Sequence, residues 1–137
     1  MNKLIAAFDG LKYSTSTRDY ALYIAAETKA HLVGVFLDDP TYTSYKIYEL
    51  ISDVDSPVQK MKELDETDKT TRAAAVADFE ICCTAKKIPY TVHHDRRIAV
   101  TELKHESIYA DLLVVQSSET LTHYTEKPPT RFIREIL

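Results

Sequence analysis

Four short apolar runs, separated by longer segments of helical character, constrain the fold of this chain more than any other feature. The runs are Lys3–Phe8, His31–Leu37, Ile88–His94 and Ala110–Val115. Such runs, rich in β-branched and aromatic residues, are typical of buried strands, and we expect the fourth to be fully buried. The segments between these runs are long enough for helical crossovers, which are right-handed in parallel sheets. The order therefore predicts an α/β fold: an open, mostly parallel, twisted sheet with helices on both faces.

Helix signals follow the first run. Hydroxyl residues at positions 14–17 offer N-caps for a helix over Asp19–Ala30. We expect an apolar stripe of this helix to pack on the sheet. The stripe consists of Tyr20, Ala21, Ile24 and Thr28, with Ala25 alongside.

A long helix is predicted from Ser56-Pro57, because a cap residue followed by proline starts helices and neither Gly nor Pro recurs before Pro89. Its charged first half should project into solvent, whereas Ala73–Cys83, apolar nearly all round, should be buried. Shorter helices are predicted over Ile98–Ser107 and Thr130–Leu137. In the last helix, the residues expected to face inward are Phe132, Ile133, Ile136 and Leu137.

Residues 38 to 55 form the least regular stretch of the chain. Tyr42, Tyr45 and Tyr48 stand at every third position there. The stretch is either a loop or a loop with a short helix. A helical stripe of tyrosines usually serves packing, and the alternative is a lid over a small pocket.

The size and charge of the chain exclude several classes of function. Its 137 residues are the usual size of one domain. A formal net charge of −4 disfavours nucleic acid, because phosphate binding needs a concentrated basic surface. No apolar run approaches the ~20 residues of a membrane span, and the N-terminus lacks the pattern of a secretory signal. We therefore expect one cytoplasmic domain over residues 1–137, with no nucleic-acid or membrane partner.

Candidate reactive residues form no catalytic or metal-binding pattern. Adjacent residues of a strand point to opposite faces, so His93 and His94 are ill placed to share a metal ion. Cys82 and Cys83 diverge by about 100° on a helix, which favours two buried apolar side chains over a disulfide or a metal clamp. Ser117 follows a strand, but it lacks the Gly-x-Ser-x-Gly elbow of a nucleophile. We therefore predict no enzyme activity and no metal.

A ligand of a parallel sheet binds beyond the carboxyl ends of the strands, where the strand order reverses. In this sequence the residues at such ends are Asp9, Phe36–Asp38, Asp95 and Gln116–Ser118.

Four motifs resemble the universal stress protein family, and the resemblance runs from residue 2 to residue 137. They are LIAAFDGL, STSTRDYALYIAAETKA, HLVGVFLDD and ADLLVV. The resemblance implies a Rossmann-like fold of the adenine nucleotide alpha hydrolase type and a role in stress response or signalling. It also implies pairing as a homodimer or as tandem domains through a fifth strand. That strand is not found before Leu137, so either the chain is trimmed or it is the first half of a tandem protein, and a sheet edge would stay open.

Nucleotide-binding members of the family carry Gly-x-x-Gly after the fourth strand and Gly-Ser or Gly-Thr further on, which wraps backbone N–H groups around phosphates. Counted from ADLLVV, the glycine positions are Gln116, Glu119 and Pro129, and the hydroxyl position is Thr130. Side chains there would occupy the space of phosphates, Glu119 would add like charge, and Pro129 removes a backbone donor. The resemblance thus implies a member without tight ATP binding.

The resemblance further places Asp9 at a nucleotide ribose and Val35-Phe36 near an adenine. The simpler alternative is that Asp9 caps backbone N–H groups of its own turn. We expect a domain that dimerises or binds a protein partner without a cofactor. The alternatives are a sensor of ATP, AMP or another small ligand and, least supported, an enzyme. The residues of a residual ligand site would be Asp9, Gly10, Val35, Phe36, Gln116, Ser117 and Thr130.

Overall fold

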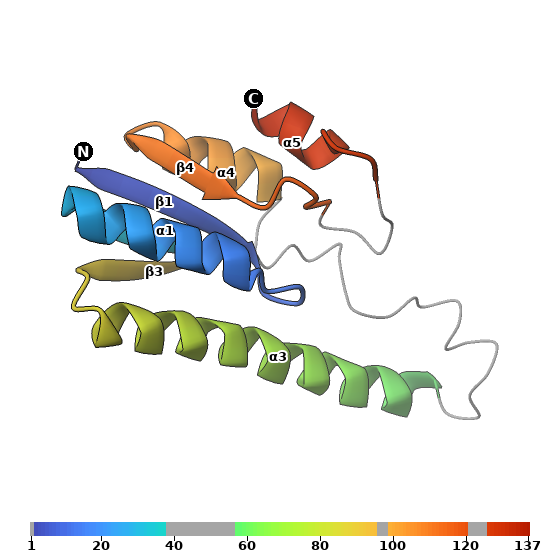
Figure 1. Ribbon diagram of the computed structural model, residues 1–137. Helices are drawn as coiled ribbons and strands as arrows, with labels where there is room; N and C mark the ends of the chain where they lie inside the picture. The colour runs from blue at the N-terminus through green and yellow to red at the C-terminus, as the bar shows by residue number, and fades with distance from the viewer. Residues whose placement is uncertain (1, 38–56, 96–98, 121–125) are drawn as a thin grey trace.

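In the part of the chain that the structure describes, four parallel strands form one sheet with helices on both faces (Figure 1). The computed structural model describes residues 2–37, 57–95, 99–120 and 126–137. The strands are β1 (Lys3–Asp9), β2 (His31–Leu37), β3 (Tyr90–Asp95) and β4 (Leu112–Val115). The helices are α1 (Thr15–Thr28), α3 (Pro57–Ala85), α4 (Ala99–Ser107) and α5 (Arg131–Ile136). The predicted α/β class is thereby confirmed.

The strand order is β3-β2-β1-β4, so the chain moves outward from β1 to β3 and then returns to the other side of β1. Along β1, Lys3 to Asp9 lie opposite His31 to Leu37 of β2. On its other side, Leu4 to Ala7 lie opposite Leu112 to Val115 of β4. The strand order therefore reverses between β1 and β4, and their carboxyl ends flank the crevice where ligands of such sheets bind.

The face that carries α1 and α3 has an aromatic centre. The ring centroids of Phe8, Phe36 and Phe79 lie 5.1, 5.5 and 5.8 Å apart. A Cβ atom at Gly34 would lie 2.6 Å from Cε1 of Phe79. The ring thus occupies the space of a side chain, which explains a glycine inside an apolar strand.

The opposite face of the sheet is covered by α4 and α5 (Figure 1). Leu103 of α4 and Phe132 of α5 are both buried against it. The strand residues that form this second core are Ile5, Ala7, Val33, Val35 and Leu37.

Helix α1 begins earlier than predicted, because Ser14 is its N-cap. The Ser14 side chain accepts a hydrogen bond from the backbone N–H of Thr17. The predicted stripe was wrong in part: Ala21, Ile24 and Ala25 pack on the core as expected, together with Leu22. Tyr20 is 68% exposed and Thr28 is exposed as well. Small residues let the helix lie close to the sheet, and the bulkier tyrosine projects outward.

Three further predictions of burial need correction. Strand β4 is half-buried, not fully buried, because it is an edge strand among the strands that the structure describes. In the second half of α3 one face is buried, at Ala75, Phe79 and Cys83, whereas Ile81 is 68% exposed. Leu137 was predicted to face inward, but it is 96% exposed.

The first half of α3 extends past the sheet, as predicted (Figure 1). Residues 38–56, with Tyr42, Tyr45 and Tyr48, lie outside the described residues.

Candidate functional site

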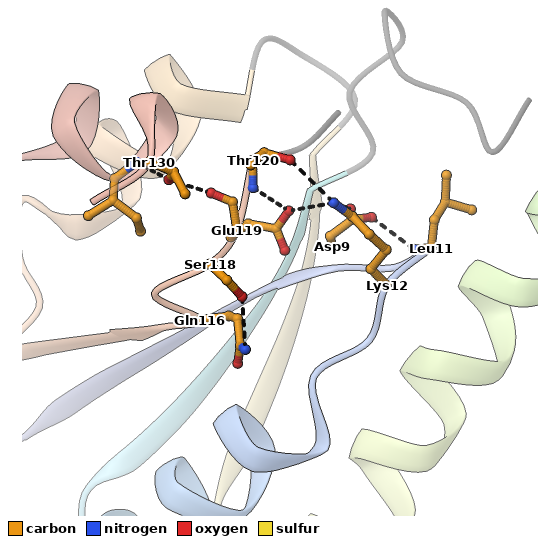
Figure 2. A network of polar contacts seen from close by, with 9 residues as sticks. Asp9, Leu11, Lys12, Gln116, Ser118, Glu119, Thr120 and Thr130 are labelled. Atoms are coloured by element: carbon orange, nitrogen blue, oxygen red, sulfur yellow. Dashed lines mark hydrogen bonds and ion pairs between the residues drawn. The ribbon is translucent and has the colours of Figure 1, made fainter. Parts of the chain in front are cut away.

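The carboxyl ends of β1 and β4 meet at a network of polar side chains (Figure 2). Asp9 closes β1, and the segment from Gln116 to Thr120 follows β4. Thr130 lies just before α5 and contacts this segment. The structure therefore brings together three of the predicted site positions: Asp9, Gln116 and Thr130.

Asp9 is buried and serves its own turn. Its Oδ1 atom accepts a hydrogen bond of 2.9 Å from the backbone N–H of Leu11, and its carbonyl accepts one of 3.1 Å from the N–H of Lys12. The residue is 2% exposed, and its Oδ2 atom is buried without a hydrogen bond. This is the turn-capping geometry that the sequence offered as the alternative to a ligand contact.

Lys12 joins the two strand ends. Its Nζ atom lies 3.8 Å from Oδ2 of Asp9, 3.4 Å from Oε1 of Glu119 and 3.4 Å from Oγ1 of Thr120. The Glu119 side chain is only 7% exposed. An ammonium group thus lies between two carboxylates at the carboxyl end of the sheet (Figure 2).

The surroundings of Asp9 raise the pKa of its carboxyl group. Burial and the Glu119 carboxylate raise the pKa of Asp9 to about 6. The Leu11 N–H, the Lys12 ammonium and the Arg72 guanidinium act in the opposite direction and only partly offset that rise.

Gln116 connects β4 to the start of α1. Its Oε1 atom accepts a hydrogen bond of 2.7 Å from the Ser14 hydroxyl, with Ser16 and Thr17 at 3.3 and 3.4 Å. Its Nε2 atom donates to the Ser118 hydroxyl at 3.1 Å. Gln116, which stands at the first glycine position of the family's phosphate-binding motif, therefore bridges β4 and α1.

Glu119 and Thr130 stand at two further positions of the family's phosphate-binding motif. Both also form hydrogen bonds within the chain. The N–H of Glu119 donates to the carbonyl of Gln116, and its carboxylate accepts from the N–H of Thr120. The Thr130 hydroxyl donates to the Glu119 carbonyl at 2.6 Å and accepts from the N–H of Ile133, so Thr130 is the N-cap of α5. Thr130 is fully buried.

The remaining predicted site residues lie in other surroundings. Val35 and Phe36 are buried in the two separate cores, one on each face of the sheet. Gly10 is buried, and a Cβ atom there would lie 2.9 Å from Cγ of Arg72. Ser117 is exposed.

Sequence reasoning missed Lys12 and Thr120. The position of Lys12 three residues after Asp9 hints at their ion pair, but its contact with Glu119 joins residues far apart in the chain. Ser14 was expected as a cap, and its bond to Gln116 was not foreseen.

A separate cavity of about 340 Å³ lies between the β1–α1 turn, α1 and α3. Within its lining, the Arg18 guanidinium donates to Asp78 at 2.6 Å, which lowers the pKa of that carboxyl. Burial and the neighbouring Asp78 raise the pKa of Tyr13. The other lining residues are Gly10, Leu11, Thr15, Thr71, Ala74 and Ala75.

Cys82 contacts the lining of this cavity, because its Sγ atom donates to Oδ2 of Asp78 at 4.0 Å. His93 and His94 belong to β3, and the His94 ring centroid lies 6.0 Å from that of Phe36. Cys83 is buried, which raises the pKa of its thiol to about 12, and Cys82 is half-buried. Within residues 2–37, 57–95, 99–120 and 126–137, no three His, Cys, Asp or Glu residues gather in a way that could hold a metal ion. Among the described helices, none is long and apolar enough to cross a membrane.

Comparisons with known proteins give a likeness of fold. The chain matches no protein-family model and no curated protein. It is similar to the crystal structure of a protein from the universal stress protein family from Burkholderia pseudomallei, with a TM-score of 0.53, 19% identity, and coverage of 85% of this chain and 83% of that one. It is also similar to the universal stress protein UspA from Lactobacillus plantarum, with a TM-score of 0.58, 14% identity, and coverage of 87% and 79%. The chain therefore has the fold of universal stress protein structures, as its sequence motifs predicted.

Proposed function

We propose that this chain is a non-enzymatic universal stress protein-type domain of the cytoplasm, which acts in stress response or signalling by pairing and without tight ATP binding. The observation that carries the proposal is the network of polar side chains at the carboxyl ends of β1 and β4. Lys12, Gln116 and Glu119 place their side chains there and bond to the surrounding chain.

A phosphate cradle works by offering free backbone N–H groups to an anion. Here the N–H of Glu119 donates to Gln116, and the N–H of Thr120 donates to the Glu119 carboxylate. Two buried carboxylates, Asp9 and Glu119, would in addition repel a polyphosphate. These features support a domain that does not use a nucleotide triphosphate.

Pairing is supported by the edge of the sheet at β4. No strand lies beyond β4 among the described residues, and Leu112–Val115 are half-buried. Ile108 and Tyr109, in the turn between α4 and this strand, are 64% and 87% exposed. An unpaired edge flanked by apolar side chains is a natural place for a second copy of the chain.

Sedimentation analysis over a range of protein concentrations tests the pairing. We expect a concentration-dependent dimer that is weakened by the double substitution Ile108→Asp, Tyr109→Asp. The matched control is Tyr23→Asp, which changes a tyrosine of α1 that is 64% exposed, and it should leave the dimer intact. A wild-type monomer at every concentration would contradict pairing between copies.

A small-ligand sensor is the second candidate, and the cavity between α1 and α3 favours it. Its 340 Å³ is within the range of small-molecule sites. A ligand that binds only the native state must raise the melting temperature. A thermal-shift screen that includes ATP, AMP and adenosine should then give a shift that Ala74→Leu removes, because Ala74 lines the cavity. Ala77→Leu, on the same helix and exposed, is the control.

A further inference from the structure

Asp9 is a carboxylic acid in a place that poorly tolerates its charge. It is 2% exposed, and of its two oxygens Oδ1 accepts the N–H of Leu11 while Oδ2 is buried with no hydrogen bond. A buried carboxylate needs hydrogen bonds to both oxygens to recover the free energy lost on leaving water. The ionised form of Asp9 is therefore poorly accommodated in this arrangement.

Charged groups face Asp9 from three directions. Glu119 approaches from the segment after β4 and disfavours ionisation. Lys12, from the β1–α1 turn, and Arg72, from α3, favour it. Burial and Glu119 outweigh the two cations, so the pKa of Asp9 rises to about 6.

The segment from Gln116 to Thr120 lies beside this acid. Glu119 and Thr120 are each 7% exposed, and both contact the Lys12 ammonium beside Asp9. If the segment separates from β1, water reaches Asp9 and Glu119 leaves its neighbourhood. Separation therefore lowers the free energy of the ionised form of Asp9 and changes the free energy of the protonated form little.

We propose that Asp9 is a proton-operated clasp: its protonated form keeps the segment Gln116–Thr120 fastened to the end of β1, and its ionised form loosens that segment. The proton comes from solvent and forms an O–H bond on the Asp9 carboxylate, so no other reactant takes part. A fall in pH through the neutral range then closes the crevice end of the sheet. This inference does not depend on the proposed pairing.

Amide hydrogen exchange read by NMR tests the clasp. The probe is the Glu119 N–H, which donates to Gln116, and its protection is compared with that of Val35 in the buried strand β2. A pKa moved from 3.8 to about 6 corresponds to roughly a 100-fold change in the opening equilibrium. Protection of Glu119 relative to Val35, corrected for intrinsic exchange, should fall by up to that factor from about pH 4 to pH 7.

Two variants and one direct titration decide the outcome. The Asp9→Asn side chain cannot ionise, so the relative protection of Glu119 in this variant should not depend on pH. The control is Asp19→Asn, which removes an exposed carboxylate of α1 and should behave as wild type. Pronounced pH dependence that persists in Asp9→Asn, or none in the wild type, would overturn the proposal. The carboxyl carbon shift of Asp9 in the unmodified chain should titrate near pH 6, and a midpoint near the ordinary value of 3.8 would also overturn it.

Discussion

The ring of Phe79 lies on Gly34 so closely that a Cβ atom there would come within 2.6 Å of the ring. Gly34 is in the middle of β2, and Phe79 is fully buried in α3. The contact between these two residues therefore fixes how closely α3 approaches the sheet.

We expect Gly34→Ala to lower the free energy of unfolding by about 1–3 kcal/mol, because an added methyl group in a packed core forces the ring or the helix to move. Urea denaturation followed by circular dichroism measures the loss. In a Phe79→Leu background the same substitution should cost less, since the smaller side chain leaves room. Equal costs in both backgrounds would show that the ring is not the obstacle.

Asp9→Asn should stabilise the protein at neutral pH. The pKa of Asp9 rises from 3.8 in the unfolded chain to about 6 in the native protein, so the native state holds its proton more tightly. Wild-type stability therefore declines as pH rises from about 4 to about 6, by at most about 3 kcal/mol, and stays low above that window. The substitution should remove this decline, and urea denaturation at about pH 4 and pH 7.5 compares the two proteins. A destabilised Asp9→Asn variant at neutral pH contradicts the prediction.

Ser14→Ala should cost about 1 kcal/mol, because Ser14 caps α1 and its hydroxyl also donates to Gln116. Thermal unfolding would detect the change. Ser16→Ala, two positions later and exposed, is the control and should alter stability by less than about 0.5 kcal/mol. A cost of the same size at both positions would show that the cap is not the cause.

Lys29→Gly and Lys87→Gly should each leave stability unchanged or raise it by up to about 1 kcal/mol. Both lysines have a φ of 56°, in the left-handed region that glycine adopts without strain. Lys86→Gly, one residue before and without positive φ, should instead lower stability. Denaturant titration of the three variants tests this contrast.

The strands and their order of appearance could be predicted, because buried parallel strands are short apolar runs and their crossovers have one hand. The burial of β4 could not be predicted, because it depends on whether a further strand covers the edge of β4. The outward position of Tyr20 was likewise hidden, because the sequence offers a tyrosine and small residues on adjacent helical positions and only packing decides between them.

The candidate site was predictable in part. Asp9 lies at a strand end, and its turn-capping bond to Leu11 is local. The contacts of Lys12 with Glu119 and of Ser14 with Gln116 join distant segments, and nothing local encodes them. Val35 and Phe36 point to opposite faces of β2, as adjacent residues of a strand must, and each belongs to a different core.

Isothermal titration calorimetry with ATP and Mg²⁺ tests the proposal that this domain does not bind ATP tightly. Because Lys12, Gln116 and Glu119 bond to one another's neighbours at the position of the phosphate cradle, we predict no saturable heat at nucleotide concentrations up to about 1 mM. A micromolar dissociation constant that requires Mg²⁺ would show that the domain binds ATP tightly despite these side chains.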